Sequence, residues 1–172
     1  MTVRRPTASQ AREVAATVLD PEMPMLSLAD LGVLRDVQVD DDARVVVTIT
    51  PTYSGCPAMA TMRADLQVRL RSAGFEDVEV RTALHPAWST DWISDGGRRK
   101  LREAGISPPG ATAPPAHGGP VPLTLLSGPR RVTCPQCGSP DTRETSYFGS
   151  TACKAQYRCA ACGEPFDHVK EI

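Results

Sequence analysis

The sequence has no long apolar run, no excess of charge of either sign and no glycine-rich nucleotide-binding motif. No window approaches the roughly 18 apolar residues that a membrane-spanning helix needs. The 19 basic and 20 acidic residues give a formal net charge of -1, which provides no general attraction to nucleic acid or to an anionic membrane. We therefore expect a cytoplasmic protein that recognises its partners locally and carries no dinucleotide fingerprint.

Cysteine is the residue type that stands out against this background. Six cysteines occur in 172 residues, and four of them form two C-x-x-C pairs. Because thiols in the cytoplasm are kept reduced, these cysteines are more naturally metal ligands or reactive thiols than a disulfide framework. The chemistry of the protein is therefore expected to centre on sulfur.

The first hundred residues alternate between helical and strand patterns. The expected elements are a helix over residues 9–19 with Ser9 as its N-cap, a β-hairpin of residues 33–39 and 44–50, a helix over 57–73 ended by Gly74, a strand over 77–84, and a short helix between Ser94 and Gly105. A strand, a helix and a further strand in this order can close a right-handed crossover. This part is predicted to be an α/β unit with a small mixed sheet.

The two C-x-x-C pairs predict a metal site at the C-terminal end. Each pair is followed by a glycine that lets the backbone turn tightly, and 21 residues with strand-like segments separate the pairs. The predicted zinc ligands are Cys134, Cys137, Cys159 and Cys162. About forty residues cannot build a sufficient core alone, so the metal is expected to supply folding free energy in a closed, non-catalytic site.

Some alternatives stay open at this metal site. Rubredoxin-type iron sites use the same double knuckle, and ligand type alone does not separate iron from zinc. Cys153 lies between the pairs and His168 lies beyond them. Each is either a spare ligand or, as we favour, a residue outside the site: a surface thiol in a loop and a solvated strand histidine.

The domain organisation follows from these patterns. Residues 1–105 form the α/β domain, residues 106–130 are dense in proline and glycine and are typical of a linker, and residues 131–172 form the ribbon. The predicted fold class is α+β, with a small mixed sheet and flanking helices followed by a C-terminal zinc ribbon.

A fifth cysteine lies at the predicted junction between a strand and a helix. In Thr50-Pro-Thr-Tyr-Ser-Gly-Cys56-Pro, Cys56 falls near the start of the longest expected helix. The helix dipole and the free amides of the first turn favour thiolate at such a position. On this ground Cys56 is either a functional thiol or a small buried filler.

Three segments of the first domain resemble a known family. They are Asp20-Pro-Glu-Met-Pro24, Leu28-Ala-Asp30-Leu-Gly32 and the segment around Cys56. Together they resemble the iron-sulfur assembly domain family, which includes SufT-like proteins. The stretch from Pro86 to Ser94, the sequel from Lys100 to Pro109 and the appended ribbon are similar to one branch, the PaaD (also called PaaJ) family of phenylacetyl-CoA epoxidase subunits. The resemblance covers nearly the whole chain except the linker.

The resemblance implies an accessory protein of the phenylacetyl-CoA 1,2-epoxidase in aerobic phenylacetate degradation. It implies a non-catalytic factor that matures the iron-sulfur or di-iron centre, with the oxygenase and the iron-sulfur reductase subunits as partners. The chain is not the oxygenase itself, because its three histidines sit in no Glu-x-x-His setting. The alternatives are a stably bound structural or regulatory subunit and an independent enzyme with Cys56 as nucleophile. A homodimer is compatible with each of these functions.

Site residues are carried over from the family by position. The resemblance implies that Cys56 and Asp30 take part in iron or cluster transfer, with Thr52, Tyr53 and Ser54 lining the same pocket. The alternative for Asp30 is an ordinary turn or cap residue, which is common before Leu-Gly. The implied cofactors are zinc in the ribbon and iron or an iron-sulfur cluster held transiently at Cys56.

Overall fold

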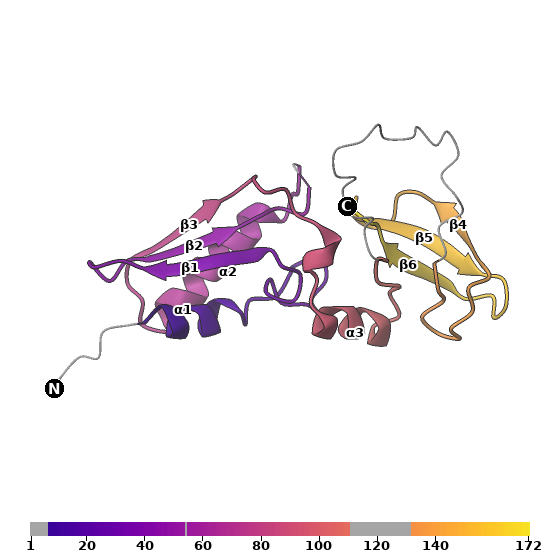
Figure 1. Cartoon of the computed structure of the whole chain (residues 1–172), viewed down its shortest axis with the longest axis horizontal. Helices are drawn as coiled ribbons and strands as arrows, with labels where there is room; N and C mark the ends of the chain where they lie inside the picture. The colour runs from indigo at the N-terminus through magenta and orange to yellow at the C-terminus, as the bar shows by residue number, and fades with distance from the viewer. Residues whose placement is uncertain (1–6, 54, 111–131) are drawn as a thin grey trace, which may run out of the picture. The chain divides into compact units, whose positions relative to one another are not determined.

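The computed structural model describes residues 7–53, 55–110 and 132–172. The chain divides into two compact units, residues 1–101 and 102–172, and each unit has its own three-stranded sheet. The elements are α1 (Ala8–Ala15), β1 (Leu34–Val39), β2 (Val45–Ile49), α2 (Met59–Ser72), β3 (Val78–Thr82), the 3-10 turn η1 (Thr90–Trp92), α3 (Asp95–Glu103), β4 (Thr142–Ser146), β5 (Lys154–Cys159) and β6 (Pro165–Val169) (Figure 1).

The sheet of the first unit is mixed, as the sequence predicts. Strands β1 and β2 pair antiparallel, and β2 and β3 pair parallel. The chain reaches β3 from β2 through α2, which is the crossover that parallel neighbours require. Helix α1 packs on β1, α2 packs on β3, and the two helices contact each other, so both cover the same face of the sheet.

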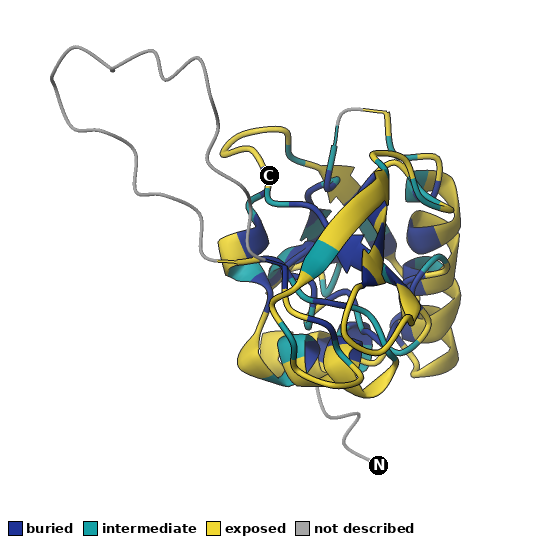
Figure 2. Cartoon of the chain, turned by 90° about the vertical axis from the view of Figure 1, so that its right-hand side faces the viewer, coloured by how far each residue is buried: buried dark blue, intermediate teal, exposed yellow. Residues whose placement is uncertain are grey.

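The central strand shows why that face is buried. Val45, Val47 and Ile49 are fully buried, whereas the residues that alternate with them are partly exposed. Successive side chains of a strand point to opposite faces, so these three residues meet the helices. Met62, Leu66 and Leu70 of α2 complete this core at helical spacing. Figure 2 shows the buried residues on the inner sides of the helices and the exposed residues on their outer sides.

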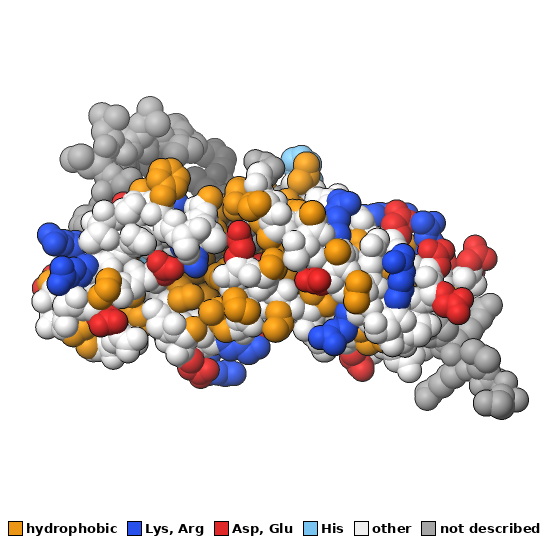
Figure 3. Space-filling model, turned by 180° about the vertical axis from the view of Figure 1, so that it is seen from behind, with side chains coloured by type: hydrophobic (Ala, Val, Ile, Leu, Met, Phe, Trp, Pro, Cys, Tyr) orange, Lys and Arg blue, Asp and Glu red, His pale blue; other side chains and the backbone are white. Residues whose placement is uncertain are grey.

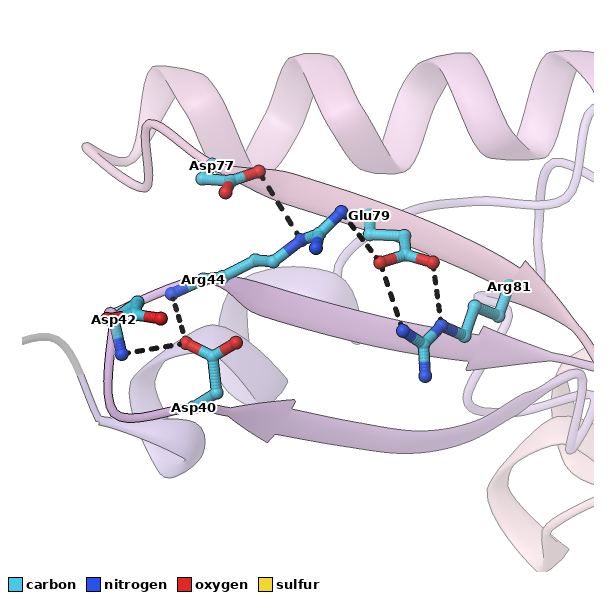
Figure 4. A network of polar contacts seen from close by, with 6 residues as sticks. All are labelled: Asp40, Asp42, Arg44, Asp77, Glu79 and Arg81. Atoms are coloured by element: carbon cyan, nitrogen blue, oxygen red, sulfur yellow. Dashed lines mark hydrogen bonds and ion pairs between the residues drawn. The ribbon is translucent and has the colours of Figure 1, made fainter.

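The open face of the same sheet is held by ion pairs. Arg44 Nη2 lies 2.8 Å from Glu79 Oε2, and Arg81 Nε lies 2.7 Å from Glu79 Oε1 (Figure 4). Asp40, in the turn between β1 and β2, accepts hydrogen bonds from the backbone N–H groups of Asp42 and Arg44. These contacts fix the hairpin turn and join β2 to β3 across a solvated surface, where each exposed ion pair adds little stability.

The helix ends differ from the sequence expectation in one place. The N-cap of α1 is Thr7 and not Ser9, because Thr7 Oγ1 accepts from the N–H of Gln10 while Gln10 Oε1 accepts from the N–H of Thr7. This capping box satisfies two end groups at once, which a cap at Ser9 would leave open. At the end of α2, Gly74 has a φ of 94° and donates to the carbonyl of Arg71, in a Schellman arrangement.

Gly32 is expected to be intolerant of any side chain. Its φ is +69°, and a Cβ built there would lie 2.6 Å from Cβ and 2.7 Å from the carbonyl oxygen of Trp92. Gly32→Ala should therefore lower the free energy of unfolding by about 3 kcal/mol or more, since conformational strain adds to overpacking. Denaturant titration followed by tryptophan fluorescence tests this, because both tryptophans lie in the first unit.

Gly74→Ala is the matched control for this prediction. Gly74 also has a positive φ, but nothing lies within 4 Å of its added Cβ. It should lose only about 1 kcal/mol from the backbone strain. Equal losses in the two variants would show that the contact with Trp92 is unimportant.

The second unit is the predicted ribbon. Strands β4, β5 and β6 form an antiparallel sheet in that order. Its core is small and consists of Val132, Cys134, Ala155, Tyr157, Cys159 and Phe166. Ser107, inside the range 106–130 that we propose as a linker, is buried and forms an isolated parallel bridge with His168 of β6. The remainder of that range from residue 111 onward lies outside the described residues.

The surface carries both signs of charge. In Figure 3, basic and acidic side chains are interspersed over the face that is shown, in keeping with the net charge of -1. Among the described residues, no helix combines the length and the apolar character needed to cross a bilayer.

Candidate metal centre and the Cys56 loop

Two identical backbone turns bring the four ribbon cysteines together. In the first, the N–H of Gly138 donates to the carbonyl of Cys134, and in the second the N–H of Gly163 donates to the carbonyl of Cys159, both at 3.0 Å. Both glycines have positive φ, 73° and 79°, which a residue with a side chain adopts only at a cost. The glycine after each pair is therefore what lets both cysteines of a pair face one point.

The sulfur positions fit a tetrahedral ion. The Sγ atoms of Cys134 and Cys162 are 3.8 Å apart, and those of Cys137 and Cys159 are 3.6 Å apart. All four sulfurs lie within 4.8 Å of one another. A tetrahedral site with metal–sulfur bonds of about 2.3 Å requires sulfurs separated by about 3.8 Å. The donor set and its spacing therefore suit one metal ion coordinated by four thiolates.

The thiols of this cluster have shifted pKa values. A backbone hydrogen bond from Cys162 lowers the pKa of Cys159 to about 7, against the opposing effect of burial. For Cys162 a backbone hydrogen bond from Glu164 lowers the pKa, but the neighbouring thiols, led by Cys137, outweigh it and raise the pKa to about 12. Four thiols this close cannot all ionise alone, so metal binding must displace protons from them.

Cys153 and His168 are both buried, so the expectation of a surface thiol and a solvated histidine is wrong. Cys153 Sγ lies 3.1 Å from Thr151 Oγ1, and His168 Nδ1 lies 3.2 Å from the carbonyl oxygen of Ser107. Neither residue belongs to the four-cysteine cluster. Packing against the segment around Ser107, which the local sequence could not indicate, covers the histidine.

Cys56 lies in the loop between β2 and α2. It is partly exposed, its N–H donates to the carbonyl of Tyr53, and α2 begins three residues later at Met59. The helix therefore starts slightly later than predicted, and Cys56 precedes its first turn. No side chain caps the N-terminus of α2, because the N-cap position is Ala58.

The predicted pocket residues are described only in part. Thr52 is buried and Tyr53 is partly exposed, next to Gly55 in the same loop. Ser54 lies outside the described residues. Thr50 is buried at the start of this loop, where its N–H donates to the carbonyl of Val33 and anchors the loop to the first unit.

Asp30 is tied to its own loop and to α3. Its Oδ2 accepts from the N–H and the hydroxyl of Ser27 and lies 2.7 Å from Lys100 Nζ, and its Oδ1 accepts from the hydroxyl of Ser94. Burial opposes ionisation of Asp30, but the hydrogen bonds from Lys100 and Ser27 outweigh it and hold the pKa below its ordinary value. These contacts support the cap interpretation, and a role in transfer stays a prediction.

Asp30→Asn should lower the free energy of unfolding of the first unit by about 1 kcal/mol at neutral pH, since charged hydrogen bonds are lost from a partly solvated site. Because folding lowers the pKa of Asp30, this stabilisation is present above the ordinary value of 3.8 and disappears as the pH falls through the lower value of the folded protein. Urea titrations of both proteins should therefore converge in acid. The exposed Asp41→Asn is the control, and a pH-independent difference for Asp30→Asn would contradict the assignment.

Within the described ranges, the four ribbon cysteines form the only group of three or more potential ligands whose donor atoms lie together. Cys56 and Asp30 belong to no such group in a single chain. Any iron held at Cys56 would therefore need further ligands from outside this chain.

Two family models match the sequence. An iron-sulfur cluster assembly protein model matches residues 9–82, and a PaaD zinc beta ribbon domain model matches residues 119–170. The first covers most of the α/β unit and the second covers the four-cysteine cluster.

Relatives match either the whole chain or its first part. The chain is 41% identical over 171 residues to a protein of Escherichia coli (strain K12) named as the D component of 1,2-phenylacetyl-CoA epoxidase, which covers 99% of this chain and 97% of that protein. It is 35% identical over 86 residues to an Fe-S protein maturation auxiliary factor of Porphyromonas gingivalis, covering 49% of this chain and 81% of that protein. A crystal structure of a domain of unknown function from Bacillus anthracis has a TM-score of 0.51 and 26% identity, covering 55% of this chain and 90% of that chain.

Proposed function

This chain belongs to the PaaD family of phenylacetyl-CoA epoxidase subunits, and we propose that it is a cytoplasmic accessory protein of that epoxidase which matures its iron-sulfur or di-iron centre. The observation that carries the proposal is the joining of two parts in one chain. An iron-sulfur assembly unit precedes a four-cysteine ribbon, over the full length shared with the E. coli relative. The protein has no catalytic turnover of its own in this proposal.

The first unit supports the maturation role. A protein of Porphyromonas gingivalis named as an Fe-S protein maturation auxiliary factor matches about half of this chain. In our proposal Cys56 is the transfer thiol, because thiolate is a soft ligand suited to iron and iron-sulfur clusters. One thiolate from a partly exposed loop binds iron weakly when alone. The remaining ligands would come from the client or from a second copy, which favours release once the client supplies its own.

The ribbon has a structural and docking role in this proposal. A closed site of four thiolates leaves no coordination position for a substrate, and zinc suits it because zinc has no redox chemistry and accepts tetrahedral geometry. We therefore propose zinc as the ribbon metal. It would stabilise a unit whose core is too small to fold without it.

A second candidate is a structural or regulatory subunit that stays bound to the epoxidase. The name of the E. coli relative, which calls it a subunit, favours this candidate. Co-purification in fixed stoichiometry with the active oxygenase would support it, whereas a maturation factor should leave before turnover.

Metal and sulfide analysis of the full chain purified without oxygen tests the transfer thiol. We expect the wild-type protein to carry substoichiometric iron and sulfide that Cys56→Ser lacks, with equal zinc in both. The matched control is Cys153→Ser, which changes a buried thiol outside the ribbon cluster. Equal iron in the wild-type protein and Cys56→Ser, or none in either, would remove Cys56 from the mechanism.

A further inference from the structure

Two aromatic side chains project from the ribbon into solvent. Tyr147 and Phe148 follow β4 directly and are 54% and 68% exposed, and Phe148 is the most exposed large hydrophobic side chain of the described residues. Their rings meet edge to face, with centroids 5.2 Å apart. We call these two residues the aromatic tip. Adjacent exposed rings are unusual in a chain with 5% aromatic residues, because exposed apolar surface on a folded domain commonly marks an interaction site.

The backbone at the aromatic tip is fixed by short hydrogen bonds. The hydroxyl of Ser146 donates to the carbonyl of Phe148 at 2.8 Å, and the N–H of Gly149 donates to the carbonyl of Lys154 at 2.8 Å. The second bond closes the connection between β4 and β5. The rings are therefore presented by a closed turn, which lowers the entropy lost when a partner covers them.

A buried cation supports the rings from beneath. Lys170 is only 6% exposed, its Nζ lies 3.7 Å from the ring centroid of Tyr147 and 4.8 Å from that of Phe148, and it donates to the carbonyl of Ala152 at 2.8 Å. Among the described residues no carboxylate pairs with this ammonium. The cation orders the rings through their π faces, and its positive potential extends through them toward solvent.

We propose that the aromatic tip is the contact by which the ribbon docks on a subunit of the epoxidase, in an apolar pocket with carboxylates at its rim. This inference rests on the proposed function for the identity of the partner. Rigid aromatic anchors with a low entropy cost are the residues that most often dominate interface energies. The uncompensated charge of Lys170 selects the acidic rim, because complementary charge across an interface steers and orients the encounter.

Binding of the intact protein to purified subunits tests the inference. The oxygenase and reductase subunits are immobilised one at a time, and the full chain is titrated as wild type, as the double variant Tyr147→Ala and Phe148→Ala, and as the control double variant Val68→Ala and Leu84→Ala. The control removes exposed apolar side chains from the first unit. We expect the tip variant to raise Kd by about thirty-fold or more, with the control within about twofold of wild type.

Zinc content and melting temperature should be the same in all three proteins, since the substituted side chains are exposed. Binding of the wild type should also weaken as salt is raised, because the rim is acidic. A tip variant that binds as tightly as the wild type overturns the docking inference and leaves the proposed function standing. A wild-type protein that binds neither subunit overturns the partner itself, and with it both proposals.

Discussion

Replacing Cys134 with serine is expected to release the ribbon metal and unfold residues 132–172, while the first unit keeps its fold. Cys134 is buried and its sulfur lies 3.8 Å from that of Cys162, so its loss opens the tetrahedral site from the inside. Structural zinc contributes about 10 kcal/mol or more to the folding of small metal domains, which exceeds what this core can replace. Zinc analysis and the amide NMR spectrum of the ribbon measure the loss.

Cys153→Ser is the matched control, because it exchanges a buried cysteine of the same unit that lies outside the cluster. It should retain about one zinc per chain and a cooperative unfolding transition. Tryptophan fluorescence, which reports on the first unit alone, should be unchanged in the Cys134 variant. A ribbon that stays folded and metal-free in a strong chelator would contradict the account of this unit.

The second large effect is expected at Cys56. Cys56→Ser should leave the fold and the zinc content intact while epoxidase activity in cells falls by about tenfold, the scale of loss that follows damage to a metal-binding site. Serine is close to cysteine in size, but it ionises far less readily and is a poor ligand for iron. The oxygenase or reductase recovered from these cells should be short of iron.

Cys56→Ala separates chemistry from packing. If Cys56 transfers iron, alanine should be as inactive as serine and both variants should melt close to the wild-type temperature. If the serine variant melts many degrees lower and the alanine variant restores full activity, Cys56 fills space in its loop and the transfer mechanism loses its central atom. The partial exposure of Cys56 favours the first result.

The parts of the fold that depend on short-range patterns were predictable. The hairpin of β1 and β2 and the core face of α2 follow from alternation and from helical spacing within a dozen residues. The four-cysteine cluster was predictable because each C-x-x-C-Gly turn positions two sulfurs by local backbone geometry alone. The cap of α1 was missed because a capping box depends on a pair of residues, Thr7 and Gln10, and not on the best single cap residue.

The parts that depend on distant contacts were not predictable. Asp30 meets Lys100 across 70 positions of sequence, and only the folded chain shows that this carboxylate joins its loop to α3. The burial of His168 depends on a bridge to Ser107, 61 positions away, in a segment rich in proline. The exposure of Tyr147 and Phe148 could not be inferred either, because the segment that contains them has the pattern of an ordinary strand.

The most direct test of the maturation account is the cofactor content of the epoxidase produced in cells that lack this protein. The oxygenase and the reductase are purified from the deletion strain, from the same strain carrying the wild-type chain, and from the strain carrying Cys56→Ser, and their iron and sulfide are measured per polypeptide. The account predicts that at least one of these two proteins is deficient in iron in the deletion and Cys56→Ser strains and is restored by the wild-type chain. Normal iron and sulfide in both proteins from the deletion strain would contradict maturation and leave the stably bound regulatory subunit in its place.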